Sequence, residues 1–188
     1  MKQLILHGIF VLFVFFILIA GCTEPPIKDP TVSVSDIGLS DVTLQTMTVN
    51  ATVVIFNPNP VGAKLNKVAF DVYYIDDIQN YLGHGEQSNI DVMSSGNTSV
   101  TIPVTVGNIQ AIKAAVTLVR KGSLTLNVNG SAFIDVTVTS FEKRFEQSRQ
   151  FQASDFESLI PDTTVPGTSV NITDKVQQLG GLLDVVPG

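Results

Sequence analysis

The sequence predicts a mostly β protein: a two-sheet antiparallel β-sandwich of many short strands with one amphipathic α-helix. Three observations lead to this prediction. Apolar and polar residues alternate over many short stretches, which is the period of a half-buried strand. The composition favours Val, Thr, Ile, Asn and Ser and contains no Trp, which suits strands and turns. A single segment, Asn108–Lys121, has helical spacing instead.

The strand from Met47 to Phe56 is the most regular of the predicted strands. Its odd positions are apolar, while Asn50 and Thr52 face the other way. Because Val54 and Phe56 make its end apolar on both faces, we expect it to lie in the middle of its sheet. A first strand region precedes it from Thr31, and later alternating stretches predict strands at Asn66–Ile75, Tyr81–Val92, Ser99–Val106, Leu124–Val128, Ala132–Val138 and Phe141–Phe151.

This strand ends in Asn57-Pro58-Asn59-Pro60. Proline has no backbone N–H and pushes the preceding residue towards extended conformations, so two Asn-Pro pairs cannot continue a ladder. Asn57 and Asn59 are candidates for binding a partner or a sugar. Asn before Pro more often bonds nearby backbone, however, and we expect a structural turn here.

The segment Asn108–Lys121 predicts one amphipathic helix packed on the sandwich. Asn108 can cap its start, and Arg120-Lys121-Gly122 supplies cations and a glycine at its end. The face expected to meet the core consists of the apolar residues at helical spacing: Ile109, Ile112, Ala115, Val116 and Val119.

Residues 1–21 predict a lipoprotein signal peptide. Lys2 precedes an apolar run from Leu4 to Ala20, and the run closes as Ile19-Ala20-Gly21-Cys22, which resembles a prokaryotic lipobox. Cleavage would leave Cys22 as the site of lipidation. The alternative is that residues 4–20 remain as an uncleaved N-terminal anchor helix. Both interpretations place an exported domain on the outer face of the cell membrane, bound to membrane lipid.

Residues 22–30 form a Pro-rich spacer, residues 31–152 the sandwich domain and residues 153–188 a C-terminal extension. The extension carries apolar residues between Thr173 and Val186, interrupted by Gly180-Gly181. This pattern fits either docking on the domain or engagement of a partner, and the sequence does not decide between them.

Composition argues against several classes of function. The net charge is -6 with 11 Lys and Arg residues, so no basic face for nucleic acid is expected. Cys22 is the only cysteine and His7 and His84 are the only histidines, which leaves too few ligands for a Cys/His zinc site. Asp71, Asp76 and Asp77 lack the regular ligand spacing of a calcium loop. We therefore expect no catalytic residues, no metal and no cofactor.

Four Asn-X-Ser/Thr triplets are possible N-glycosylation sites: Asn50, Asn97, Asn129 and Asn171. Such triplets arise by chance in a chain rich in Asn and Thr. The chain is nevertheless expected to be exported, and Asn50 and Asn129 fall on the polar phase of their strands. Glycosylation is therefore expected if the source is an archaeon.

The motif Phe56-Asn57-Pro58-Asn59-Pro60 and the order of elements around it resemble the group-2 late embryogenesis abundant proteins, also called the water stress and hypersensitive response (WHy) domain. An alternating strand precedes the motif; a hairpin, a Thr/Val strand, one helix and a final pair of strands follow it. The resemblance covers Pro30 to Gln152. It implies an antiparallel β-sandwich of about seven strands with one helix, similar to fibronectin type III or immunoglobulin-like domains, a link to desiccation and water stress, and no catalytic residues. The lipobox departs from the plant pattern and fits a prokaryotic, archaeal lipoprotein.

We therefore expect a membrane-anchored, non-enzymatic protective or binding module of the water-stress type. The alternative is a cell-envelope assembly or adhesion lipoprotein that binds an envelope protein or glycan partner by a sheet edge or by the tail.

Overall fold

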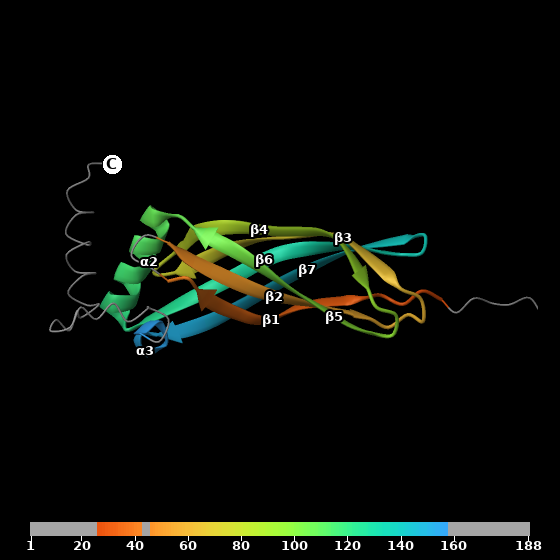
Figure 1. Ribbon diagram of the computed structural model, residues 1–188, viewed down its shortest axis with the longest axis horizontal. Helices are drawn as coiled ribbons and strands as arrows, with labels where there is room; N and C mark the ends of the chain where they lie inside the picture. Colours follow the sequence, from red (N-terminus) through yellow and green to blue (C-terminus); the bar gives the residue numbers. More distant parts are fainter. Residues whose placement is uncertain (1–25, 43–45, 158–188) are drawn as a thin grey trace, which may run out of the picture.

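The computed structural model describes residues 26–42 and 46–157, which fold into seven strands in two antiparallel sheets (Figure 1). One sheet has the order β1-β2-β5 and the other β4-β3-β6-β7. The predicted two-sheet sandwich is confirmed. The strands are β1 (Thr31–Ser40), β2 (Met47–Asn57), β3 (Ala63–Ile75), β4 (Gln79–Val92), β5 (Gly96–Val106), β6 (Ser123–Val136) and β7 (Thr139–Gln152). The helices are α2 (Asn108–Lys121) and α3 (Ala153–Glu157).

Strand β2 lies between β1 and β5, as the sequence predicts. Val49, Val53 and Ile55 on its inner face are fully buried against the opposite sheet. Phe56 on its outer face is 42% exposed, so this end of the strand is not buried on both sides. The strand is central because it has a hydrogen-bonded neighbour on each edge, not because both of its faces are covered.

Strand β6 is continuous through Gly130, where the sequence predicts two separate strands. A side chain at Gly130 would lie 2.3 Å from the Ala69 carbonyl oxygen and 2.4 Å from Phe70 Cβ, so the glycine permits a close approach of β3. Phe70 pairs with Gly130 in the register and fills the core beside Phe145. The missing side chain therefore leaves room for a large aromatic ring.

The two sheets also meet along their sides. Strand β1 runs beside β7, and β4 beside β5. Arg149 of β7 donates to the Ile37 carbonyl oxygen at 2.8 Å, contacts the Asp36 carboxylate of β1, and lies over the Phe151 ring at 4.9 Å from its centroid. Lys143 pairs with Asp29 at the same side. These cross-links join strands that share no ladder.

The sandwich is elongated, with different features at its two ends (Figure 1). We call one end the motif end: it carries residues 26–30, the β2–β3 loop, the β4–β5 turn and the β6–β7 turn. We call the other the helix end: it carries α2, α3 and the β3–β4 turn. Every strand runs between the two ends, so loops distant in sequence meet at each of them.

Helix α2 is present over the predicted residues, but it turns a different face to the sheets. The buried residues are Ala111, Ala114, Thr117 and Leu118. Ile109 is 59% exposed, and the rest of the predicted core face is half-buried. The predicted core face is wrong because apolar residues lie along two stripes of the helix. The stripe that packs on the sheets contains Ala111 and Ala114, whose small side chains permit close packing.

The ends of α2 match the prediction at one terminus only. Gly122 adopts a left-handed conformation with φ 74°, and its N–H donates to the Leu118 carbonyl oxygen at 2.7 Å, which is a glycine C-cap. The N-cap is Gly107, with no capping side chain; Asn108 is already the first helical residue, so it cannot act as the predicted cap.

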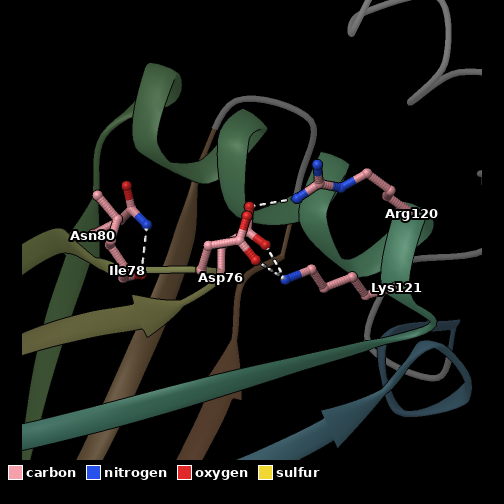
Figure 2. A network of polar contacts seen from close by, with 6 residues as sticks. Asp76, Ile78, Asn80, Arg120 and Lys121 are labelled. Carbon is pink, nitrogen blue, oxygen red and sulfur yellow. Dashed lines mark hydrogen bonds and ion pairs between the residues drawn. The ribbon is translucent and has the colours of Figure 1, made fainter.

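Charged residues fasten the last turn of α2 to the β3–β4 turn (Figure 2). Asp76 forms ion pairs with both Arg120 and Lys121, and Lys121 also reaches Asp77 at 3.2 Å. The hydrogen bond from Lys121 holds the pKa of Asp76 below its ordinary value, and the Arg120 charge acts in the same direction. The sequence argued only against a calcium loop at these aspartates and did not identify their partners on α2.

The predicted signal or anchor at residues 1–21 and the lipidation site Cys22 lie outside the described residues, as does most of the 153–188 extension. Within residues 26–42 and 46–157, no helix is both long and apolar enough to cross a bilayer.

Candidate functional site

The Asn-Pro-Asn-Pro motif lies at the motif end, where it terminates β2. Asn57 is 0% exposed and Asn59 is 1% exposed, although both are strongly polar. Pro58 is half-buried and Pro60 is exposed. A buried amide side chain is costly unless each of its polar groups has a partner, so the partners of Asn57 and Asn59 define what the motif does.

Asn57 joins the β2–β3 loop to the β4–β5 turn. Its Nδ2 donates to the Val61 carbonyl oxygen at 2.9 Å and to the Met93 carbonyl oxygen at 3.0 Å. Its Oδ1 accepts hydrogen bonds from the backbone N of Asn59 at 3.0 Å and from Asn59 Nδ2 at 2.9 Å. One side chain therefore fixes the β2–β3 loop, the β4–β5 turn and the second asparagine of the motif.

Asn59 extends these contacts to the spacer. Its Oδ1 accepts a hydrogen bond from the Lys28 backbone N at 2.7 Å, and its Nδ2 donates to the Lys28 carbonyl oxygen at 2.8 Å. The Asn59 backbone carbonyl accepts from Ser95 N at 2.8 Å and from Ser95 Oγ at 3.2 Å. We call this set of contacts around Asn57 and Asn59 the asparagine clamp.

The asparagine clamp is structural, because protein groups occupy both asparagine side chains. The sequence predicts the local part correctly: the Asn57 side chain bonds the backbone two residues on, which is an Asx turn. The bonds to Lys28 and Met93, 31 and 36 residues away from their asparagines, are not visible in the sequence. Both amides are buried and face protein partners, so neither is presented at the surface.

The three possible glycosylation sites in the described part differ in access. Asn97 and Asn129 are exposed. Asn50 is half-buried in β2, and its Nδ2 donates to Ser40 Oγ at 2.9 Å. A glycan on Asn50 would have to break that bond, whereas Asn97 and Asn129 offer free access. Asn171 lies outside the described residues.

His84 lies on the outer face of the four-stranded sheet in a small charged network. Its Nδ1 is 2.8 Å from Asp71 Oδ1, and its Nε2 is 3.7 Å from Glu86 Oε2. Lys67 pairs with Glu86 at 2.8 Å and holds the pKa of that carboxyl below its ordinary value. All four side chains are about half exposed. In the described part of the chain, no three His, Cys, Asp or Glu side chains gather as metal ligands would.

An open hollow of about 550 Å³ lies at the motif end between the β2–β3 loop, β4 and the β6–β7 turn. Its lining includes Gly62, Val92 and Thr137, with Asp91 and Asp135 at its wall. Hydrogen bonds from Ser140 and Asn66 lower the pKa of Asp135. The hollow lies between two turns and the end of β4, and Lys64 lines it together with the two carboxylates.

Comparison with known proteins agrees with this architecture. Residues 52–149 match the family described as late embryogenesis abundant protein. This match covers more than half of the chain and includes both asparagines of the clamp, Asn57 and Asn59. The chain belongs to the late embryogenesis abundant protein family.

Other late embryogenesis abundant proteins and an archaeal protein are similar to this family member. It is 31% identical over 121 residues to an uncharacterized protein of Methanocaldococcus jannaschii, an alignment that covers 64% of this chain and 66% of that relative, just under two thirds. The solution structure of an Arabidopsis thaliana protein superposes with a TM-score of 0.57 at 19% identity, covering 70% of this chain and 87% of that one. A solved late embryogenesis abundant (LEA) protein gives 0.52 at 15% identity, covering 71% and 76%.

Proposed function

We propose that this late embryogenesis abundant protein is a membrane-tethered, non-enzymatic protective module on the outer face of the cell membrane. The observation that carries the proposal is the clamped spacer: Asn59 binds both backbone groups of Lys28, six residues after the lipobox cysteine Cys22. A linker to an anchor needs a firm attachment at the domain, and a buried family motif provides one here. The lipobox supports lipid as the anchor.

The outer face of the three-stranded sheet supports a protective role. It presents hydroxyl and amide groups in facing pairs, such as Thr52 and Thr101, whose Oγ1 atoms lie 2.9 Å apart. We call this surface the hydroxyl face, and it consists of Ser33, Ser35, Ser40, Thr48, Asn50, Thr52, Ser99, Thr101 and Thr105. Surface hydroxyls can hydrogen-bond envelope lipids and sugars when water is withdrawn.

The anchor is tested on protein from native membranes. We expect intact mass to show a chain that begins at Cys22 and carries a lipid, and a Cys22→Ser variant to leave the membrane fraction. A chain that begins at Met1 and stays in the membrane would replace lipidation with the uncleaved anchor. The same mass spectrum reports glycans on Asn97 and Asn129.

The protective role is tested by drying. Vesicles that carry the full chain should retain a trapped dye on drying and rehydration better than vesicles without it. A Thr52→Val, Thr101→Val variant, which keeps shape but removes hydroxyls, should protect less. Thr125→Val on the four-stranded sheet is the matched control. Equal dye loss from all vesicles, and unchanged survival of drying in cells that lack the gene, would rule the role out.

Strand addition to a partner, the alternative prediction, is opposed by the strands at the sheet edges. A bulge between Val34 and Asp36 interrupts β1, and another opposite Val72 and Tyr73 interrupts β4. Strand β5 contains Pro103, which has no N–H to offer, and β7 carries charged side chains along its length. Such features block edge-to-edge pairing. The other route of that alternative, binding of an envelope partner by the tail, falls on residues outside the described part of the chain and stays a prediction.

A further inference from the structure

Exposed apolar side chains gather at the motif end. The described part of the chain exposes nine large apolar side chains, and six of them lie at or near this end: Ile27, Phe56, Val61, Met93, Phe133 and Val138. Isolated exposed apolar residues are ordinary on protein surfaces. Their concentration at one end, on separate loops, is the observation that calls for an explanation.

Three of these side chains project from neighbouring turns. Val138 is 98% exposed in the β6–β7 turn, Met93 is 60% exposed in the β4–β5 turn and Val61 is 38% exposed in the β2–β3 loop. Asn57 Nδ2 bonds the carbonyl oxygens of both Val61 and Met93. Thr137, beside Val138, lines the same hollow as the β2–β3 loop. The asparagine clamp therefore fixes the backbone at Val61 and Met93, and the β6–β7 turn that carries Val138 lies across the hollow from the β2–β3 loop.

The charge at this end is nearly balanced. Residues 26–30, 57–64, 91–97 and 135–140 contain two lysines and three aspartates, so their net charge is 2 - 3 = -1. The whole chain carries -6. Contact with a neutral lipid surface therefore meets little electrostatic resistance at the motif end, and its attraction would come from apolar area.

The spacer limits how far this end can stand from the membrane. Asn59 fixes Lys28, so only the six steps from Cys22 to Lys28 separate a lipid-bearing residue from the clamped backbone. Six residues span at most about 20–22 Å when fully extended. The polar headgroup layer is about 5–8 Å deep on each side of a bilayer, so a spacer of this length keeps the motif end close to the membrane and lets the loop tips reach it.

We propose that the motif end is a lipid-binding surface: Val61, Met93 and Val138 insert into the interfacial layer of the bilayer, and the sandwich stands upright with α2 directed away. The inference rests on the proposed tether. Insertion to the headgroup–acyl boundary removes apolar area from water, and the asparagine clamp already pairs the backbone carbonyls of Val61 and Met93 within the protein.

The test uses the absence of tryptophan from the chain. Full chains that carry Val138→Trp, or Ile78→Trp as the matched control, are reconstituted into phosphatidylcholine vesicles that contain brominated lipid. Ile78 is 71% exposed in the β3–β4 turn at the helix end. We expect quenching of Val138→Trp to exceed that of Ile78→Trp by at least about twofold, as insertion at the interface requires.

The outcomes separate the two proposals. Chains that float with the vesicles and show equal quenching at both sites would overturn loop insertion and leave the tether standing. Chains that do not float would overturn the tether and, with it, the insertion that rests on it. Stronger quenching at Val138→Trp in floating chains supports both.

A second set of variants tests whether the quenching depends on the apolar side chains of the motif end and not on the tryptophan introduced at Val138. With Val61→Trp as the reporter, Met93→Asp and Val138→Asp together should lower quenching to the level of Ile78→Trp, because carboxylates do not enter the interface readily. Ile78→Asp with Ile109→Asp, which adds the same charge at the helix end, should leave the Val61→Trp signal unchanged. Circular dichroism of each variant confirms the fold. Undiminished quenching in the Met93, Val138 variant would overturn the proposal.

Discussion

At the scale of single residues, two buried asparagines hold the loops of the motif end together, although asparagine is usually a surface residue. Asn57 and Asn59 are buried because the chain supplies a protein partner for each side-chain amide group. Their environment resembles that of a helix cap, in which a side chain replaces missing backbone partners. Removing either amide leaves backbone groups in the interior without hydrogen bonds.

We predict that Asn57→Ala lowers the free energy of unfolding by roughly 2–4 kcal/mol, because it leaves buried carbonyl and N–H groups without partners. Urea unfolding followed by circular dichroism measures the change. Asn97→Ala, at an exposed asparagine, is the control and should change stability by less than about 0.5 kcal/mol. A similar small loss in both variants would mean that water replaces the asparagine clamp.

At this scale, the sequence was enough to predict the turn after β2 but not the long-range hydrogen bonds of the asparagine clamp. Proline chemistry at Pro58 and Pro60 ends β2 whatever surrounds it, so the turn could be predicted locally. The contact of Asn59 with Lys28 exists only because the sheets bring residue 28 alongside the motif. The buried placement of Asn57 also depends on the β4–β5 turn. Long-range partners of this kind require the fold itself.

At the scale of elements, α2 shows where periodicity fails. Its existence, its bounds and its glycine C-cap follow from the sequence, whereas its orientation does not. A helix with apolar residues on two stripes can dock by either, and the choice depends on the surface it meets. Here Ala114 and Leu118 fit the sheets, and Ile109 is left exposed. The strands were easier to predict because a period of two leaves only two faces.

The orientation of α2 gives a paired prediction. Leu118→Ala should lower the free energy of unfolding by about 2–4 kcal/mol, because it empties a buried site. Val116→Ala on the half-buried stripe should cost about 1 kcal/mol or less. Chemical denaturation of both variants under the same conditions makes the comparison. A larger loss for Val116→Ala would indicate that the helix docks by the face the sequence predicted.

The attachment of α2 to the β3–β4 turn should depend on pH. The pKa of Asp76 is lowered in the folded chain, chiefly by its hydrogen bond from Lys121. The unfolded chain therefore binds the proton more readily. The stabilisation is present above the ordinary Asp pKa of 3.8 and is lost as the pH falls below it, through the lower folded value.

We expect Asp76→Asn to be less stable than the parent at neutral pH and to lose less stability between about pH 4 and pH 2. Unfolding free energies across that range measure the difference. Asp77→Asn, at a side chain that is 90% exposed, is the control and should follow the parent. Parallel curves for the parent and Asp76→Asn would show that these ion pairs do not couple α2 to pH.

At the scale of the whole molecule, the two sheets are joined along their sides, β1 to β7 and β4 to β5, as well as through the core. The core follows from alternating sequence, and the sandwich could be predicted from it. The contacts along the sides could not be predicted, because the sequence does not show that β1 lies beside β7, where Arg149 finds its partners. It then bonds Ile37, contacts Asp36 and covers Phe151.

We predict that Arg149→Ala lowers the free energy of unfolding by about 1–2 kcal/mol, through loss of the bridge to β1 and of the cation–π contact. Arg144→Ala is a matched control on the same strand: its side chain is 87% exposed and its pair with Glu142 stays within β7. That control should change stability by less than about 0.5 kcal/mol. Thermal unfolding of both variants provides the test.

The clamped spacer also determines how the molecule would respond to mechanical load. Strand β1 begins at the motif end and β7 finishes at the helix end, and the two run side by side in the same direction. A force that pulls residue 26 away from α3 therefore acts along both strands. It strains their side-chain bridges and the β1–β2 hydrogen bonds together, in shear, instead of opening them one after another. The Asn59 bonds to Lys28 carry this tension first. The motif that ends β2 would therefore also be the point at which force from the spacer enters the domain.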